Sequence, residues 1–115
     1  MLAGFPGVLA EHNFQTPSGN IVCNAGHVAS GGRAIACVVL SESDKRGQHV
    51  RWMRPTGLAH ANWVLANAAT DVGVLAYGRT WTWSGFRCLS ARAGLTCRNR
   101  SDHGFFLSRE RQRIF

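Results

Sequence analysis

Four cysteines in two close pairs place the strongest constraint on how this chain can fold. Cys23 and Cys37 have 13 residues between them, and Cys88 and Cys97 have 8. Each pair lies in a stretch whose pattern predicts strand, turn and strand, and opposed residues of an antiparallel hairpin have the Cβ separation that a disulfide requires. Among the three possible pairings, we therefore expect disulfides 23–37 and 88–97, each closing a local hairpin.

Zinc binding is the alternative use of these cysteines. A structural zinc site usually contains a short Cys-x-x-Cys knuckle, and no two cysteines of this chain have that spacing. An even number of cysteines in a small chain with disulfide-type spacing is typical of an oxidising compartment. We therefore expect a secreted, periplasmic or cell-envelope protein. No stretch approaches the roughly 20 apolar residues that a membrane-spanning helix needs.

With 115 residues the chain is expected to form one domain, without a linker or an internal repeat. We expect residues 11–115 to be a single disulfide-bonded β domain. The preceding segment, 1–10, is apolar and ends in Val8-Leu9-Ala10, with small residues at the two positions that a signal peptidase reads. It is interpreted either as the remnant of a signal peptide or as an ordered N-terminal arm.

Short runs of alternating apolar and polar residues, separated by turn residues, predict an all-β or mainly β protein. We expect a small antiparallel sandwich or barrel. A first hairpin is predicted from strands that begin at Ile21 and Arg33, with a loop over 26–32 and an exposed polar loop over 41–49. A meander of short strands is then predicted over 72–75, 79–83, 86–89, 95–99 and 105–107.

Two segments have ambiguous patterns. Residues 50–71 contain Trp52, Leu58, Trp63 and Leu65, which we expect to be buried, and residues 58–69 fit a helical turn or an irregular crossing. The tail over 108–115 fits either a capped helical turn or an edge strand.

Several motifs along the chain resemble those of a known family. They are FQTPSGNIVC at 14–23, LAYG at 75–78, FRCLS at 86–90, GLTCRN at 94–99 and HGFFLSRE at 103–110. Together they resemble a family of small secreted or lipid-anchored bacterial domains of unknown function, over most of the chain. The resemblance implies an extracytoplasmic, disulfide-bonded domain and no assigned activity. Members often carry extra cysteines in the middle of the chain, which this sequence lacks.

The whole chain has a formal net charge of +7, and its positive charge is concentrated in the last third. Residues 1–78 contain five basic and four acidic side chains, whereas residues 79–115 contain eight arginines against Asp102 and Glu110. The planar guanidinium group suits carboxylate, phosphate and sulfate groups. This surplus indicates either an anionic partner or a solvated face that keeps the protein soluble.

The hairpin over 95–110 holds most of the candidate site residues. Arg98, Arg100 and Arg109 are expected to flank a turn that contains Asp102 and His103, and to bind an anionic ligand. Two roles are open to His103: bonding a backbone carbonyl to hold the hairpin, or serving as a general acid or base beside the arginines.

Four tryptophans, at positions 52, 63, 81 and 83, are many for a domain of this size. Most must contribute to the core, because aromatic rings supply large buried areas. Trp81 and Trp83 share one strand face, and Trp83, next to the turn at Ser84-Gly85, is expected to be the more exposed ring. An exposed ring would offer a stacking surface for sugars or bases, so Trp83 joins the candidate ligand-binding residues.

The sequence favours binding over catalysis. It contains no recognised catalytic motif and no phosphate-binding loop, and six acidic residues give little support for a paired-carboxylate glycosidase. We expect a secreted binding module for an anionic or carbohydrate component of the envelope, with no metal or cofactor. Alternatives are a protein-interaction, inhibitor or structural accessory role, and a nuclease-like hydrolase that uses His103. The expected partner is an anionic polysaccharide or another protein; nucleic acid is less favoured.

Overall fold

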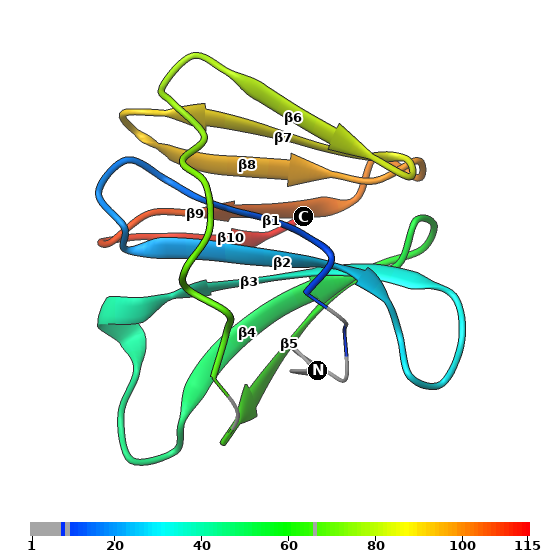
Figure 1. Cartoon of the computed structure of the whole chain (residues 1–115), viewed down its shortest axis with the longest axis horizontal. Coiled ribbons are helices and arrows are strands. Elements are labelled where there is room, and N and C mark those ends of the chain that lie inside the picture. Colours follow the sequence, from blue (N-terminus) through cyan, green and yellow to red (C-terminus); the bar gives the residue numbers. More distant parts are fainter. Residues whose placement is uncertain (1–7, 9, 66) are drawn as a thin grey trace.

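The chain folds into two five-stranded antiparallel sheets (Figure 1). A computed structural model describes residue 8, residues 10–65 and residues 67–115. The first sheet contains β1 (His12–Gln15), β2 (Ile21–His27), β3 (Arg33–Val39), β4 (Gln48–Met53) and β5 (Ala59–Val64). The second contains β6 (Thr80–Trp83), β7 (Phe86–Ala91), β8 (Gly94–Arg98), β9 (Gly104–Leu107) and β10 (Gln112–Ile114). A short 3₁₀ turn, η1 (Leu40–Glu42), follows β3.

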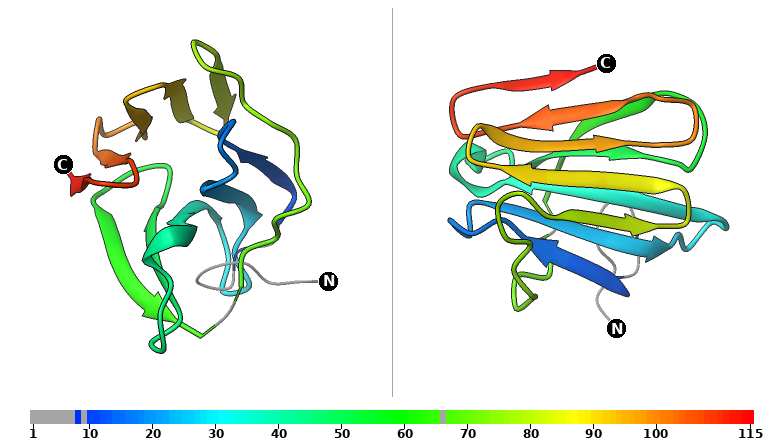
Figure 2. Two further views of the ribbon diagram at one scale, coloured as in Figure 1. Left: turned by 90° about the vertical axis from the view of Figure 1, so that its left-hand side faces the viewer. Right: turned by 90° about the horizontal axis from the view of Figure 1, so that it is seen from above.

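Each sheet is a meander in which every strand pairs with the next one along the chain. The sheets face each other as a sandwich, which the two additional views show most clearly (Figure 2). The expected all-β antiparallel fold is therefore confirmed, and of its two alternatives, sandwich or barrel, the structure has the sandwich. No helix in the described part of the chain is long and apolar enough to cross a membrane.

The main core lies between the two sheets. Inward-facing side chains from both sheets form one buried cluster, including Ile35, Met53, Phe86, Leu95 and Phe105. Period-two alternation explains which residues face inward, since successive strand side chains point to opposite faces. In β9, Phe105 and Leu107 are fully buried whereas Phe106 is half-buried, so Phe105 and Leu107 face the core.

Both expected disulfides are present, Cys23–Cys37 and Cys88–Cys97. Each joins directly opposed residues of neighbouring strands, β2 with β3 and β7 with β8. The sulfur atoms of Cys23, Cys37 and Cys97 lie within 4.8 Å of one another. The two disulfides therefore pack against each other at the centre of the sandwich, one from each sheet.

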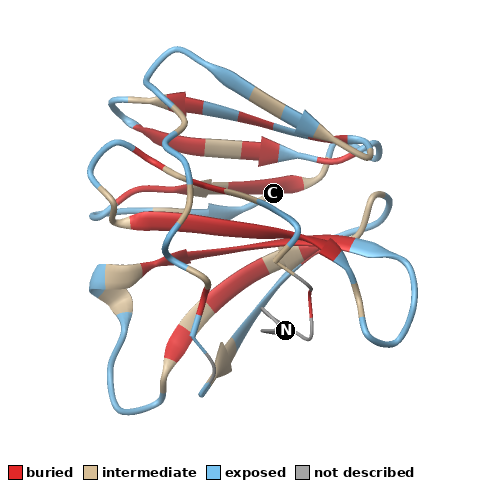
Figure 3. Cartoon of the chain, in the orientation of Figure 1, coloured by how far each residue is buried: buried red, intermediate tan, exposed pale blue. Residues whose placement is uncertain are grey.

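The first sheet is also covered on its outer face. Val22, Ala36, Val38 and Val50 point away from the second sheet and are buried in a separate apolar cluster. The central strands β2 and β3 are consequently buried along almost their whole length (Figure 3). A strand that is buried on both faces has a near-continuous apolar sequence, as these two strands have.

The connection between the sheets supplies part of this cover. It runs from the end of β5 across the outer face, where Ala68 is buried in the apolar cluster. The side chain of Asn24 donates to the Ala69 carbonyl and accepts from the Ala69 amide, at 3.1 and 2.9 Å. The Ala68 amide donates to Oε1 of Gln48 at 3.1 Å. Buried polar side chains thus hold the connection by bonding its backbone.

The same connection then borders β1. Gln15 forms an isolated parallel bridge with Val74 and bonds to the backbone at positions 72, 73 and 75. Of the N-terminal segment 1–10, only Val8 and Ala10 lie within the described residues. Val8 is fully buried and bridges Val28. The two interpretations of that segment, signal remnant or arm, otherwise concern positions outside the described residues.

The expectations for residues 50–71 need correction. A helical turn or irregular crossing was expected over 58–69, whereas residues 48–53 and 59–64 form the antiparallel strands β4 and β5. Leu58 and Leu65 were expected to be buried but are 62% and 84% exposed. β5 is the edge strand and only Ala59 reaches the core, so its sequence lacks the alternation of a half-buried strand.

Elsewhere the predicted strands agree with the structure to within a few residues. The polar loop predicted over 41–49 is shorter, because η1 includes Ser41 and Glu42 and β4 begins at Gln48. The segment predicted as a strand over 72–75 makes only the bridge at Val74. The tail forms the edge strand β10, which was one of its two expected structures.

Candidate functional site

Arginines gather on the outer face of the second sheet, where the structure describes no covering layer. Opposed residues form two rows across the strands. One row runs through Thr80, Leu89, Thr96, Phe106 and Arg113, and the other through Thr82, Arg87, Arg98 and Gly104. We call Arg87, Arg98 and Arg113, with the threonines beside them, the arginine face.

Local sequence explains why these side chains face outward. In β7 and β8 the buried residues Cys88, Ser90, Leu95 and Cys97 alternate with the outward-facing ones. Because the disulfide Cys88–Cys97 must lie between the sheets, the residue on either side of each cysteine points to solvent. The disulfide therefore fixes the arginine face as well as the core.

Arg87 and Arg98 are directly opposed on neighbouring strands. Like charges at opposed positions of a sheet destabilise the pairing. Arg98 lies 3.3 Å from the carboxylate of Asp102, a side chain that is 83% exposed, whereas Arg87 forms no ion pair with any described residue. The centre of the arginine face thus carries excess positive charge.

A shallow pocket of about 370 Å³ lies over this pair, lined by Thr80, Arg87, Leu89, Thr96 and Arg98. It offers two guanidinium groups, two hydroxyl groups and one exposed leucine. Next to it, the Phe115 ring lies 4.6 Å from the guanidinium carbon of Arg98 and 5.5 Å from that of Arg113. These cation–π contacts orient both guanidinium groups without neutralising their charge.

The turn that follows β8 is organised by Asn99. Its side-chain oxygen accepts from the amides of Ser101 and His103, and its side-chain nitrogen donates to the carbonyls of Arg54 and Gly57. The positive φ of Asp102, 62°, completes the turn. The turn is thereby joined to the β4–β5 loop and holds a fixed position.

His103 is half-buried in this turn, and its Nδ1 lies 3.3 Å from the backbone carbonyl of Phe115. This contact is the structural alternative considered for the residue. No Asp or Glu side chain among the described residues forms an ion pair with His103. The geometry of His103 supports a role in attaching the C-terminal strand.

The other candidate residues divide between the two ends of the sandwich. Arg100 lies near the β6–β7 turn, where its side chain packs over Gly85. Arg109 lies in the β9–β10 turn, at the opposite end of β9 from Asp102 and His103. The expectation that Arg109 flanks their turn is therefore wrong, because the four-residue strand β9 separates the two turns.

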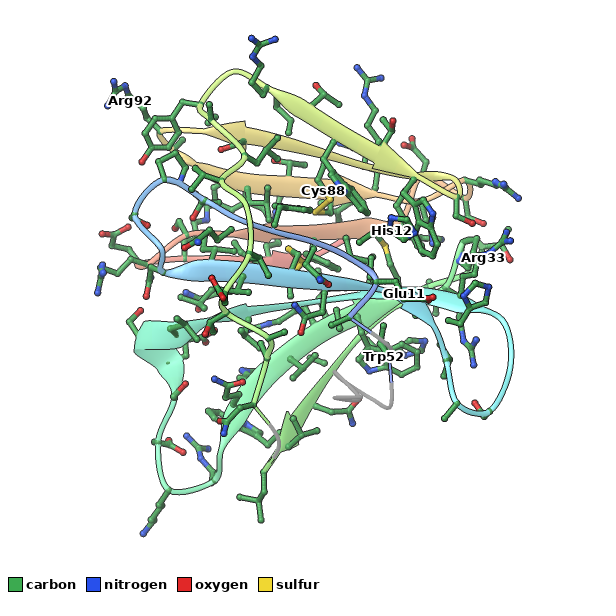
Figure 4. The ribbon with its side chains drawn as sticks, viewed as in Figure 1. Glu11, His12, Arg33, Trp52, Cys88 and Arg92 are labelled. Carbon is green, nitrogen blue, oxygen red and sulfur yellow. A yellow bond between two sulfur atoms is a disulfide. The ribbon has the colours of Figure 1, made fainter. Side chains whose placement is uncertain are left out.

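Trp83 faces inward and packs against the core, as does Trp81. Its ring stacks on His12 with centroids 4.5 Å apart, and the Arg33 guanidinium lies 5.9 Å from its centre. His12 and Arg33 are labelled in Figure 4. Trp83 is half-buried, with both neighbours on its ring. It does not form a free stacking surface.

Histidine–carboxylate pairs occur outside the arginine face. Nδ1 of His27 lies 2.8 Å from Glu11, and the backbone amide of His27 is the main cause of the lowered pKa of that carboxyl. His49 stacks on Trp63 and lies 3.6 Å from Glu42. Burial, together with the nearby Arg51 charge, lowers the pKa of His49.

Metal-binding groups are few in the described part of the chain. The one group of three or more potential ligands that converges is Cys23, Cys37 and Cys97. Their sulfur atoms are in disulfides, and a disulfide sulfur lacks the thiolate charge that binds metal.

Sequence reasoning found Arg98 but missed Arg87, Arg113 and the threonines. A usable signal was present: once Cys88 and Cys97 are assigned to the core, alternation places Arg87, Leu89, Thr96 and Arg98 on the opposite face. Arg113 and Phe115 required the register of β10 as well, which the tail sequence does not determine.

Comparison with known protein families gives a match over the part of the chain that contains the second sheet. Residues 65–115 are similar to a family of unknown function (DUF6636). The match spans the connection, the arginine face and all five strands behind it, and it brings no activity. No curated protein and no solved structure showed significant similarity to the chain.

Proposed function

We propose that this chain is a secreted binding module that recognises an anionic polysaccharide through the arginine face. The observation that supports the proposal most directly is the opposed pair Arg87 and Arg98. Opposed like charges lower the stability of a sheet, and a bound carboxylate or sulfate would relieve the repulsion by accepting from both guanidinium groups.

The composition of the face favours a sugar polymer over other anions. Thr80 and Thr96 supply hydroxyl groups, and Leu89 supplies an apolar surface against which a sugar ring can lie. The phenyl rings near the face, Phe106 and Phe115, are half-buried, and Phe115 lies beneath two arginines. Bases of single-stranded nucleic acid need open aromatic faces for stacking, which this arrangement does not offer.

Two disulfides in a small domain support a location outside the cytosol. Such a location would give the protein access to acidic polymers of an envelope or of a host surface. The location expected from the cysteines and the positive charge of the arginine face therefore both favour an acidic polymer as the ligand.

The test is binding of the oxidised protein to alginate and heparin, with dextran as the uncharged polymer. We expect binding to both anionic polymers, with an affinity that decreases as salt increases. The double variant Arg87→Gln/Arg98→Gln should bind at least tenfold more weakly and with a flatter salt dependence, because fewer fixed charges contact the polymer.

The matched control is Lys45→Gln/Arg46→Gln, which removes the same formal charge from the β3–β4 loop. It should leave the affinity within about twofold of the parent if the arginine face forms the site. Equal losses in both double variants would show that only net charge matters. Tighter binding to oligo(dT) than to either polysaccharide would also contradict the proposal.

A further inference from the structure

A second pocket lies at the other end of the sandwich from the turn of Asp102. Three turns and the connection between the sheets surround it. Residues 16–20 come from the β1–β2 turn, residues 91–94 from the β7–β8 turn, residues 108–110 from the β9–β10 turn, and Tyr77 from the connection. The motifs TPSGN, LAYG and LSRE, which the arginine face does not use, thus meet at one place. The pocket has a volume of about 200 Å³.

The hydroxyl group of Thr16 is the first indication of a ligand. Thr16 lines the pocket and is 5% exposed, yet its Oγ1 has no hydrogen-bond partner among the residues that the structure describes. The backbone of Thr16 is fixed, since its amide donates to Ile21 and its carbonyl accepts from the amide of Gly19. A buried polar atom without a partner is costly, and a ligand hydroxyl in the pocket would satisfy it.

Two arginines are the second indication. Arg92 and Arg109 line the same pocket and form no ion pair with any described residue. The Arg92 guanidinium lies 5.0 Å from the centre of the Tyr77 ring, which orients it at the rim (Figure 4). Glu110 is the one carboxylate among the lining residues, so the pocket carries a net positive charge.

Two glycines allow the turns around the pocket to approach closely, and the pocket is small. Gly94 has a φ of 151°, and a Cβ at this position would lie 2.5 Å from the Leu107 carbonyl oxygen. Gly19, with a φ of 75°, forms the tip of the β1–β2 turn. Small-molecule sites commonly have volumes of roughly 300 to 1,000 Å³, so this pocket suits a ligand of about one sugar residue.

We propose that this pocket binds the terminal residue of an acidic sugar, such as a hexuronate. Arg92 and Arg109 bind its carboxylate, Tyr77 contacts the apolar face of the pyranose ring, and Thr16 and Glu110 bond its hydroxyl groups. The site shares no residue with the arginine face and does not depend on the function proposed for that face.

The test is an NMR titration of the ¹⁵N-labelled oxidised protein with glucuronate. We expect shifts confined to the backbone amides of residues 16, 18–20, 77, 91–94 and 108–110. Glucose, which lacks the carboxylate, and inorganic phosphate, which lacks the ring, should each bind at least tenfold more weakly. Equal affinity for glucose or for phosphate would overturn the proposal, as would tighter binding of acetyl-alanyl-alanine, whose terminal carboxylate belongs to a peptide.

Variants separate the two groups of contacts. Arg92→Gln/Arg109→Gln should weaken glucuronate binding at least tenfold, whereas the control Lys45→Gln/Arg46→Gln should not change it. Thr16→Val keeps the shape of the side chain and removes the unpartnered hydroxyl, so it should weaken binding threefold or more while Tm stays equal or rises. A lower Tm would show that the hydroxyl has an internal partner, and unchanged binding would show that it does not contact the ligand; either result overturns its assigned role.

Discussion

The two sheets have the same number of strands and the same meander order, yet they are exposed to solvent differently. The central strands of the first sheet, β2 and β3, are buried on both faces, because Val8 and the connection cover their outer side. The second is buried on one face, and its outer side carries the opposed arginines. The two sheets thus differ in their outer faces: that of the first is largely covered, and that of the second is open and carries arginines.

A pair of matched substitutions on the two outer faces should give the largest difference. Val50 is fully buried on the outer face of the first sheet, whereas Leu89 is 45% exposed on that of the second. Val50→Asp buries an unpaired charge and should cost about 4 kcal/mol or more in the free energy of unfolding. Leu89→Asp should cost about 1 kcal/mol or less. Urea unfolding measures both, and similar losses would mean that the faces do not differ.

Removing each disulfide in turn tests whether the two bonds contribute equally to the free energy of unfolding. The loops closed by Cys23–Cys37 and Cys88–Cys97 have sequence separations of 14 and 9. On the chain-entropy model, replacing both cysteines of a pair by alanine should lower the free energy of unfolding by about 3 kcal/mol. The loss should be slightly larger for the longer loop. Comparison of the two unfolding midpoints would check this order, and a much larger loss for the 88–97 pair would contradict it.

Charge reversal at Arg87 should separate stability from binding. Arg87→Glu replaces the repulsion with Arg98 by an opposed ion pair, which should raise the free energy of unfolding by about 0.2 to 1 kcal/mol. Retention on immobilised heparin should fall. Arg87→Gln, which removes the repulsion without adding an ion pair, serves as the intermediate control, and a destabilised Arg87→Glu protein would show that the two side chains do not interact.

The smallest expected effect is the pH dependence of stability that comes from His49 in the first sheet. Burial lowers the pKa of His49 below its ordinary value of 6.5, so the unfolded chain binds a proton more readily than the folded one. The stability from this residue is present above pH 6.5 and decreases as pH falls through that value. Urea midpoints at pH 7.5 and 5.5 should therefore differ less in His49→Gln than in the parent. An unchanged difference would assign the pH dependence to other groups.

The second sheet could be predicted from sequence in most of its detail. Its strands are half-buried, so apolar and polar residues alternate, and turns such as Ser84-Gly85 interrupt the pattern clearly. The cysteine pairs could be predicted for the same reason, since Cys88 and Cys97 are equidistant from their turn. The strands β2 and β3 were found because they are continuous apolar runs next to a turn.

What the sequence could not predict depends on contacts between distant segments. β4 and β5 lack a clean pattern because β4 packs on both faces and β5 is an exposed edge. The position of Arg109 required knowing that β9 is only a short strand between two turns. The pocket at Thr16 is formed by four segments that are distant in the sequence. Local periodicity does not indicate which distant segments lie together, so the pocket could not be predicted.

The placement of the disulfides within the sheets has a consequence for the covalent connectivity of the molecule. Neither bond crosses from one sheet to the other, so the connection over 65–79 is the only covalent path between them. A protease that cut this segment once would leave two fragments that each retain a disulfide-closed ring. On a denaturing gel without reductant they would migrate separately, whereas in native buffer the apolar interface would hold them together as a non-covalent heterodimer.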